Sequence, residues 1–195
     1  MNRNVIINNL IQKNNYKTYL EIGLDDGRNF NSIKIDKKVS VDPAIGEYVH
    51  AKPTHKMTSD EFFKNNKDKF DIIFIDGLHE SDQVYKDITN SLKILNPNGS
   101  VVCHDMNPFE IGHQIIPRQQ KVWTGDCWKA WVKVKSEFDD LLMYVIDSDW
   151  GVGIIQNKLG ESKIKVNEEL TFENFIKNKK YWLNLITLDQ FKSKV

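Results

Sequence analysis

Short apolar segments alternate with helical segments through most of this sequence, and this alternation restricts the fold more than any other feature. The clearest strand is FDIIFID at 70–76, which is apolar apart from its two aspartates. Such a run is typical of a strand that is buried on both faces of a sheet. Further strands are predicted at 18–23, 38–42 and 100–105, with helical segments between them. This order favours a parallel sheet covered by helices on both faces.

The carboxyl-terminal part of the sheet follows a different pattern. LLMYVID at 141–147 and GVGIIQN at 151–157 are predicted to be two strands joined by the short turn SDW. A hairpin of this kind places one antiparallel strand at or near an edge of the sheet. We predict a leading helix at 3–15 and a helical extension at 158–195, on either side of a core at 16–157. The sequence therefore indicates a single domain of the α/β class.

Composition excludes several classes of protein. The chain has 195 residues, of which 40% are hydrophobic, and this is enough for one domain with a core. Its 27 basic and 27 acidic residues are spread along the chain, without a basic block that would favour nucleic acid or an anionic membrane. The apolar runs are too short to cross a bilayer, and the first residues do not resemble a signal peptide. With two cysteines, we expect a cytoplasmic protein without disulfides; its oligomeric state stays open.

Polar residues stand at the ends of four predicted strands. Ligands of open parallel sheets bind at the carboxyl ends of the strands, so these side chains are candidates for one common site. Glycines in the first turn would let the chain turn tightly and let a ligand approach the backbone. The residues concerned are Glu21, Gly23, Gly27, Asp42, Asp76, His104 and Asp105.

The first turn also indicates the charge of the ligand. It lacks the G-x-G-x-x-G pattern of dinucleotide-binding proteins and contains Asp25 and Asp26, which would repel a pyrophosphate. Asp42 follows Glu21 at about the 20-residue spacing of a carboxylate that binds ribose hydroxyls. A cationic nucleoside such as S-adenosylmethionine suits this acidic turn better than NAD does. An NAD-dependent oxidoreductase on a doubly wound fold is the alternative.

Six parts of the chain carry a family resemblance: YLEIGLDDGRN, VSVDP, MTSDEFF, FDIIFIDGLHESDQVYKDI, LNPNGSVVCHD and the closing hairpin. In this order they resemble the class I S-adenosylmethionine-dependent methyltransferases, most closely the branch of small O-methyltransferases and sugar O-methyltransferases. The resemblance covers about residues 15–157. It implies a Rossmann-like three-layer sandwich with a seven-stranded, mostly parallel sheet, in which the last strand is antiparallel and lies in the carboxyl-terminal hairpin.

The same resemblance implies how the cofactor lies. Its methionine side would contact the first strand and turn, its ribose would be held by the aspartate after the second strand, and its adenine would lie near the following helix start. Asp76 would also contact the cofactor. The residues implied on the methionine side are Glu21, Gly23 and Gly27. Asp42 is implied at the ribose, and Thr58, Ser59 and Asp60 are implied near the adenine.

The chemistry of methyl transfer needs a base, a metal or both, because a sugar hydroxyl is a poor nucleophile near neutral pH. Several enzymes of this branch hold a divalent metal, Mg²⁺ or Mn²⁺, at the ends of two neighbouring strands, and the resemblance implies Asp76, Asp105 and His104 as its ligands here. His79 and His104 are the candidate bases, with Asp105 also in the catalytic set. Leu78 stands where some relatives carry an acidic residue, so the resemblance does not identify the base.

These observations lead to one functional hypothesis: an O-methyltransferase that acts on a small sugar-like or polyol acceptor, with or without the assistance of a metal ion. A cofactor-binding scaffold without catalytic activity is a further alternative, and N or C could be the methylated atom. The long irregular stretch 106–125 is expected to cover the acceptor through Trp123. Trp128, Trp131 and Cys103 are predicted to be core residues, and His113 a surface or loop residue.

Overall fold

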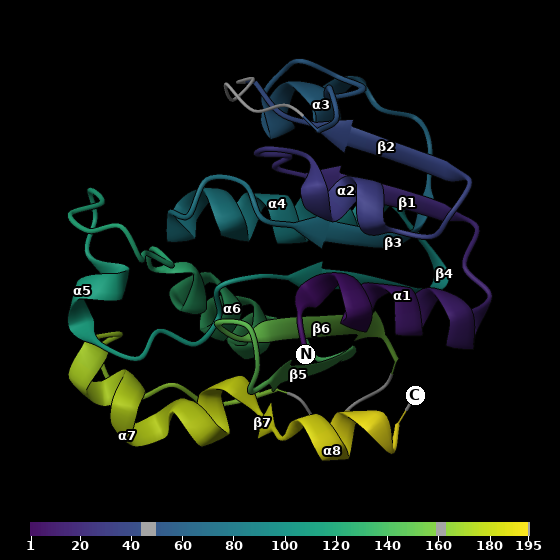
Figure 1. The fold of residues 1–195 in the computed structure, drawn as a ribbon. Coiled ribbons are helices and arrows are strands. Elements are labelled where there is room, and N and C mark those ends of the chain that lie inside the picture. The colour runs from purple at the N-terminus through teal and green to yellow at the C-terminus, as the bar shows by residue number, and fades with distance from the viewer. Residues whose placement is uncertain (44–49, 159–162, 195) are drawn as a thin grey trace.

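A computed structural model describes residues 1–43, 50–158 and 163–194 of the chain (Figure 1). Its strands are β1 (Thr18–Ile22), β2 (Lys37–Val41), β3 (Phe70–Ile75), β4 (Leu95–Cys103), β5 (Leu141–Ile146), β6 (Val152–Asn157) and β7 (Leu185–Ile186). Within the described residues these seven strands form one sheet in the order β2-β1-β3-β4-β6-β5-β7. Neighbouring strands are parallel, except that β6 is antiparallel to β4 and to β5. The predicted seven-stranded, mostly parallel sheet is confirmed.

The composition of that sheet differs in one detail from the expected one. The hairpin strand β6 is the antiparallel strand, as expected, but it lies inside the sheet between β4 and β5. The seventh strand is β7, a two-residue segment that pairs in parallel with β5 at the edge. So short a segment carries no strand periodicity, which is why the sequence pattern indicated only a helical extension there. Residues 159–162 of that extension lie outside the described residues.

Helices cover both faces of the sheet (Figure 1). One face packs against α3 (Ser59–Asn65), α4 (Ser81–Ile94), α6 (Cys127–Glu137) and α7 (Phe172–Leu183). The other face packs against α1 (Arg3–Asn14), α2 (Arg28–Ser32) and α8 (Leu188–Lys192). A four-residue helix, α5 (Ile111–Gln114), lies in the long connection between β4 and α6. The structure therefore has three layers.

The two cores explain the apolar run of β3. Ile73 and Ile75 belong to the core on the α4 side, whereas Ile72 and Phe74 belong to the core on the α1 side. Because successive residues of a strand point to opposite faces, both faces must be apolar when both are covered. The predicted core residues Trp128, Trp131 and Cys103 are all fully buried.

Local contacts set two further features of these elements. Thr58, one residue before Ser59, caps α3, because its side chain accepts from the backbone N–H of Glu61 while Glu61 accepts from that of Thr58. The segment NPNG lies within β4, where Asn98 has a φ of +63° and the pairing with β3 shifts register. Among the described residues no helix has the length and apolar character needed to cross a bilayer.

Candidate active site

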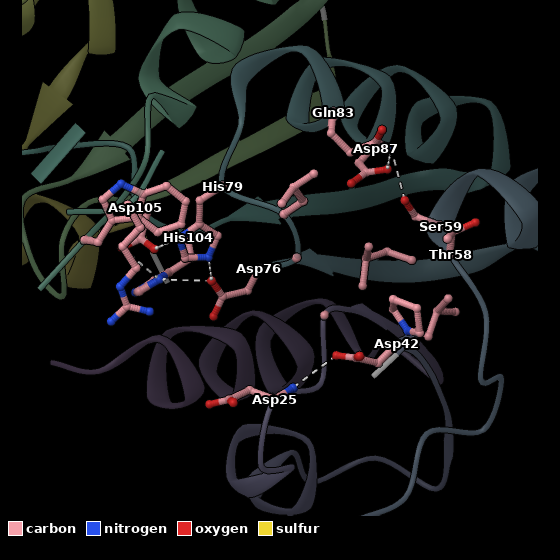
Figure 2. Close-up of a pocket in the computed structure, with 18 of the residues that line it drawn as sticks. Asp25, Asp42, Thr58, Ser59, Asp76, His79, Gln83, Asp87, His104 and Asp105 are labelled. Atoms are coloured by element: carbon pink, nitrogen blue, oxygen red, sulfur yellow. Dashed lines mark hydrogen bonds and ion pairs between the residues drawn. The ribbon is translucent and has the colours of Figure 1, made fainter. Parts of the chain in front are cut away.

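A cavity of about 980 Å³ runs along the carboxyl ends of β1, β2, β3 and β4. Its size falls within the range of ~300–1,000 Å³ that is usual for sites of small molecules. Figure 2 shows two groups of polar side chains along it: Asp76, His79, His104 and Asp105 gather at one end, and Asp42 lies with Thr58 and Ser59 at the other. Side chains far apart in the sequence therefore meet at one edge of the sheet, as the strand ends indicated.

Two carboxylates and two imidazoles form a compact group, which we call the reactive cluster: Asp76, His79, His104 and Asp105. His79 Nε2 lies 3.3 Å from Asp76 Oδ1, and His79 Nδ1 lies 3.2 Å from Asp105 Oδ2. His104 Nδ1 faces the same two carboxylates, at 3.4 Å from Asp76 Oδ1 and 3.2 Å from Asp105 Oδ1. Each histidine thus contacts both aspartates.

The backbone at the ends of β3 and β4 positions this cluster. The N–H of Asp76 donates to the carbonyl of Ile22, and that of His104 donates to the carbonyl of Ile75, at 2.8 and 3.1 Å. Asp105 then adopts a φ of +63°, a conformation that short polar residues tolerate better than most side chains do. The chain therefore turns sharply just after β4, beside the end of β3.

Mutual stabilisation of charge shifts the pKa values of Asp76, His79 and His104. Burial raises the pKa of Asp76, but the charge of His104 and the contacts with both imidazoles outweigh it and hold that pKa well below its usual value. Burial lowers the pKa of His79 and of His104, but the neighbouring carboxylates raise both, that of His104 more strongly. In this environment of low polarity, each charged group depends on its partners.

The aromatic side chain of Trp123 covers the cluster on the cavity side. Its indole stacks on the His79 ring, with centroids 5.3 Å apart and an angle of 16° between the planes. Gly125, two residues later, has a φ of +60°, and a Cβ there would lie 1.7 Å from the carbonyl oxygen of His79. The loop 106–125 can therefore pack against His79 because residue 125 is glycine.

The opposite end of the cavity is built around Asp42. This carboxylate accepts the backbone N–H groups of Leu24 and Asp25 at 2.7 and 3.3 Å, and so fixes the turn after β1 (Figure 2). Thr58, Ser59 and Asp60 line the cavity at the start of α3. Two residues that the sequence pattern did not indicate, Gln83 and Asp87 of α4, also line it. Burial raises the pKa of Asp87 to about 6.

A methyltransferase-domain family model matches residues 10–106, the part of the chain that carries β1 to β4 and both ends of the cavity. The chain belongs to this methyltransferase family. Together with the fold, this makes it a class I S-adenosylmethionine-dependent methyltransferase, and it removes the alternative of an NAD-dependent oxidoreductase. The sequence of this chain matches none of the curated proteins.

Solved structures share the fold of this methyltransferase at low sequence identity. The SAH-bound methyltransferase PaMTH1 of Podospora anserina matches with a TM-score of 0.58 at 17% identity, over 80% of this chain and 78% of that one. The SAM complex of the O-methyltransferase TomG from Streptomyces achromogenes matches with a TM-score of 0.55 at 15% identity, over 81% and 80%. The SAH complex of an O-methyltransferase from Bacillus cereus gives 0.54 at 13% identity, over 79% of each chain.

Not every residue predicted for the cofactor lies on the main cavity of the methyltransferase. Gly23 does, and its φ of +86° brings the turn close to β3, because a Cβ there would lie 2.1 Å from the carbonyl oxygen of Asp76. Glu21 lines a second, smaller cavity instead. Gly27 lines neither cavity, and its φ of +80° and missing side chain allow close packing against Ala51. His113, predicted at the surface or in a loop, belongs to α5 and is buried beside Trp150.

The sequence pattern also missed two residues at the reactive cluster of the methyltransferase, Arg3 and Asp149. Arg3 Nη1 lies 3.0 Å from His104 Nε2, and Arg3 Nε lies 3.6 Å from Asp76 Oδ2. Asp149 Oδ1 lies 3.6 Å from His104 Nε2. Asp149 could have been found, because the turn before an antiparallel strand that pairs with β4 lies beside the end of β4. No local signal marks Arg3.

Glu21 of the methyltransferase makes stability depend on pH. The side chains of Tyr19 and Asn29 donate to Glu21 Oε2, but burial is the larger effect and raises the pKa of Glu21 from 4.5 to about 8. The folded protein therefore holds this proton more tightly than the unfolded chain does. The resulting stabilisation is present below pH 4.5 and is lost as the pH rises through about 8.

We expect Glu21→Gln, which imitates the neutral form, to relieve this loss in the methyltransferase. Near pH 5 the variant should unfold at a urea concentration similar to that of the wild type. Near pH 8 it should be more stable than the wild type by on the order of 1–3 kcal/mol. Urea unfolding followed by tryptophan fluorescence at both pH values measures this. A stability difference that does not change with pH would contradict the assignment.

Proposed function

We propose that this methyltransferase transfers a methyl group from S-adenosylmethionine to a hydroxyl oxygen of a small, sugar-like or polyol acceptor. The observation that carries the proposal is the position of the reactive cluster: two carboxylates and two imidazoles meet at one end of a cavity whose other end presents Asp42. The neighbours named O-methyltransferases, from Streptomyces achromogenes and Bacillus cereus, support oxygen as the target.

The residues of the main cavity suit the cofactor. Asp42 would accept the ribose hydroxyls, and Thr58, Ser59 and Asp60 would surround the adenine edge. Along the cavity between Asp42 and the reactive cluster the turn contributes Gly23 and Asp25, so a cationic nucleoside would meet a carboxylate and no basic side chain at that turn. S-adenosylmethionine supplies an electrophilic methyl group when bound in this orientation.

His79 is the residue we propose as the base. It lines the cavity at the reactive cluster, and its imidazole contacts Asp76 and Asp105, which would stabilise the imidazolium formed when it accepts the hydroxyl proton. His104 is more enclosed, with 5% of its side chain exposed against 21% for His79. We therefore assign His104 to holding Asp76 and Asp105 in place.

A divalent cation also fits this end of the cavity. Asp76, His79 and Asp105 each offer a ligand atom, and these atoms lie within 4.8 Å of one another. His79 Nδ1 is buried and makes no hydrogen bond with any described residue, although Asp105 Oδ2 lies 3.2 Å away. With a cation bound there, His79 would be a ligand, and the cation would replace it in activating the acceptor hydroxyl. One nitrogen and two carboxylate oxygens suit Mn²⁺, Fe²⁺ or Zn²⁺ as well as Mg²⁺. Such a cation would lower the pKa of an acceptor hydroxyl.

The acceptor would lie between the cluster and the loop 106–125. Trp123 and Trp150 offer flat apolar faces there, and Arg118 lies over the Trp123 indole at 5.9 Å from the ring centroid. Leu78 and Val122, both exposed, complete an apolar rim. An aromatic face beside hydrogen-bonding groups suits the apolar side of a sugar ring together with its hydroxyls.

A methylation assay tests this proposal. The protein would be incubated with S-adenosylmethionine and a panel of sugars, polyols, phenols and amines, with S-adenosylhomocysteine and methylated products measured by mass spectrometry. We expect a methyl ether of a hydroxyl acceptor, at least tenfold less of it after EDTA treatment, and recovery with Mn²⁺ or Mg²⁺. Methylation of amines alone would contradict oxygen as the target, and activity that resists EDTA would remove the metal. Cofactor binding without any product would favour the inactive scaffold.

A further inference from the structure

A second cavity of about 440 Å³ adjoins the main one. Four residues line both cavities, and they mark where the two meet: Arg3, Gly23, Asp25 and Asp76. Beyond this junction the second cavity is acidic, with Asp26 and Asp149 among its lining residues. The junction lies beside the reactive cluster, because Asp76 belongs to both.

This step depends on the proposed function: the shape of S-adenosylmethionine explains why a second cavity would open at this junction. The sulfur of S-adenosylmethionine carries three substituents: the adenosyl group, the methyl group, and a chain that ends in an ammonium and a carboxylate. With the adenosyl group at Asp42 and the methyl group facing the cluster, the third substituent needs separate space. The second cavity opens at the point where the sulfur would lie, next to Gly23.

The negative charges of the second cavity suit the ammonium of that amino-acid group. Few residues there could bind its carboxylate. The carboxylates of Asp25 and Asp76 suit the ammonium, but a carboxylate among them needs a cation. Among the described residues, the cations that line this cavity are Arg3 and Arg28. The Arg28 side chain is 77% exposed and pairs with Asp26, whereas that of Arg3 is 34% exposed and lies at the junction.

Arg3 is fixed in place but has hydrogen-bonding capacity to spare. Its backbone N–H donates to Asp149 Oδ2 at 2.7 Å. Two residues earlier, the main-chain nitrogen of Met1 donates to Ser148 Oγ at 2.9 Å. The guanidinium contacts the carboxylates of Asp76 and Asp149 only at 3.5–3.6 Å. Because a guanidinium has five N–H donors, it can bind a further carboxylate without losing its position.

We propose that Arg3 binds the carboxylate of the amino-acid group of the cofactor. The first residue of α1 thereby completes a site that the strand ends otherwise build. This role differs from that of Asp42, because it concerns a part of the cofactor that shorter adenosine compounds lack. Two ligands can therefore separate it from a general effect on the fold.

The test compares S-adenosylhomocysteine with 5′-methylthioadenosine, which has the same adenosine and sulfur but no amino-acid group. Isothermal titration calorimetry would measure both ligands on the wild type, Arg3→Gln and Arg3→Lys. We expect Arg3→Gln to bind S-adenosylhomocysteine about 10- to 100-fold more weakly, and 5′-methylthioadenosine within about twofold of the wild type. Arg3→Lys, which keeps the charge, should lose less.

Lys13→Gln is the matched control, because it removes an exposed cation from the last turn of the same helix and should change neither affinity. Equal weakening of both ligands by Arg3→Gln would overturn the proposal in favour of a structural role, as would unchanged affinity for S-adenosylhomocysteine. Thermal unfolding identifies a misfolded variant, in which case Arg3→Lys against the wild type decides by the same ligand comparison. A wild type that binds neither ligand would overturn the proposed function together with this assignment.

Discussion

Asparagine in place of Asp105 should lower the turnover number about 100-fold or more, while the affinity for S-adenosylhomocysteine stays within about twofold of the wild type. Asp105 contacts Nδ1 of both histidines of the reactive cluster, at 3.2 Å in each case. Asparagine keeps the shape of the side chain but removes the negative charge that would stabilise a protonated His79. It also tolerates the φ of +63° at this position, so the backbone should not change.

Single-turnover and steady-state measurements with the acceptor found in the methylation assay check this result. Asp140→Asn, an exposed aspartate in the turn before β5, is the control and should match the wild type in both measurements. If Asp105→Asn keeps full turnover, Asp105 has no part in the chemistry. If it loses cofactor affinity as strongly as turnover, the cluster holds the cofactor instead of the acceptor.

Alanine in place of Gly23 should destabilise the fold by about 2–3 kcal/mol or more and abolish cofactor binding. The residue has a φ of +86°, and a Cβ there would lie 2.1 Å from the carbonyl oxygen of Asp76 and 2.5 Å from Gly77 Cα. Both are backbone atoms of the neighbouring segment, which cannot move aside as a flexible side chain would. The turn after β1 must therefore separate from the end of β3, and the cavity between them changes shape.

Gly77→Ala is the matched control for this substitution. A Cβ at Gly77 would have Ile22 Cγ2 as its nearest neighbour at 3.6 Å, which is ordinary contact. Urea unfolding should give this variant a stability within about 1 kcal/mol of the wild type, well above that of Gly23→Ala. If the two variants are equally stable, the close approach of β1 and β3 is not essential to the fold.

Much of the fold and of the site followed from local patterns in the sequence. The strand at Phe70–Ile75 could be predicted because both of its faces are covered, which makes nearly every position apolar. Asp76, His104 and Asp105 could be predicted as neighbours because parallel strands end at one edge of the sheet. His79 followed from its position just after such an end.

The remaining features depend on packing between segments that are distant in the sequence. Arg3 reaches the cluster because α1 docks its first turn against the residues before β6, and no pattern near Arg3 encodes that contact. The edge strand β7 is two residues long and depends on pairing with β5. Gln83 and Asp87 are polar positions of an amphipathic helix, and only the packing of α4 against α3 shows that they line the cavity.

A crystal structure with bound S-adenosylhomocysteine would test the central claim most directly, that the cavity at the strand ends holds the cofactor with its sulfur facing the reactive cluster. We expect electron density for the ribose within hydrogen-bond distance of Asp42, for the adenine beside Ser59, and for the sulfur between Gly23 and Asp76. A nucleoside bound elsewhere, or one whose sulfur points away from Asp76, His79 and Asp105, would contradict the account.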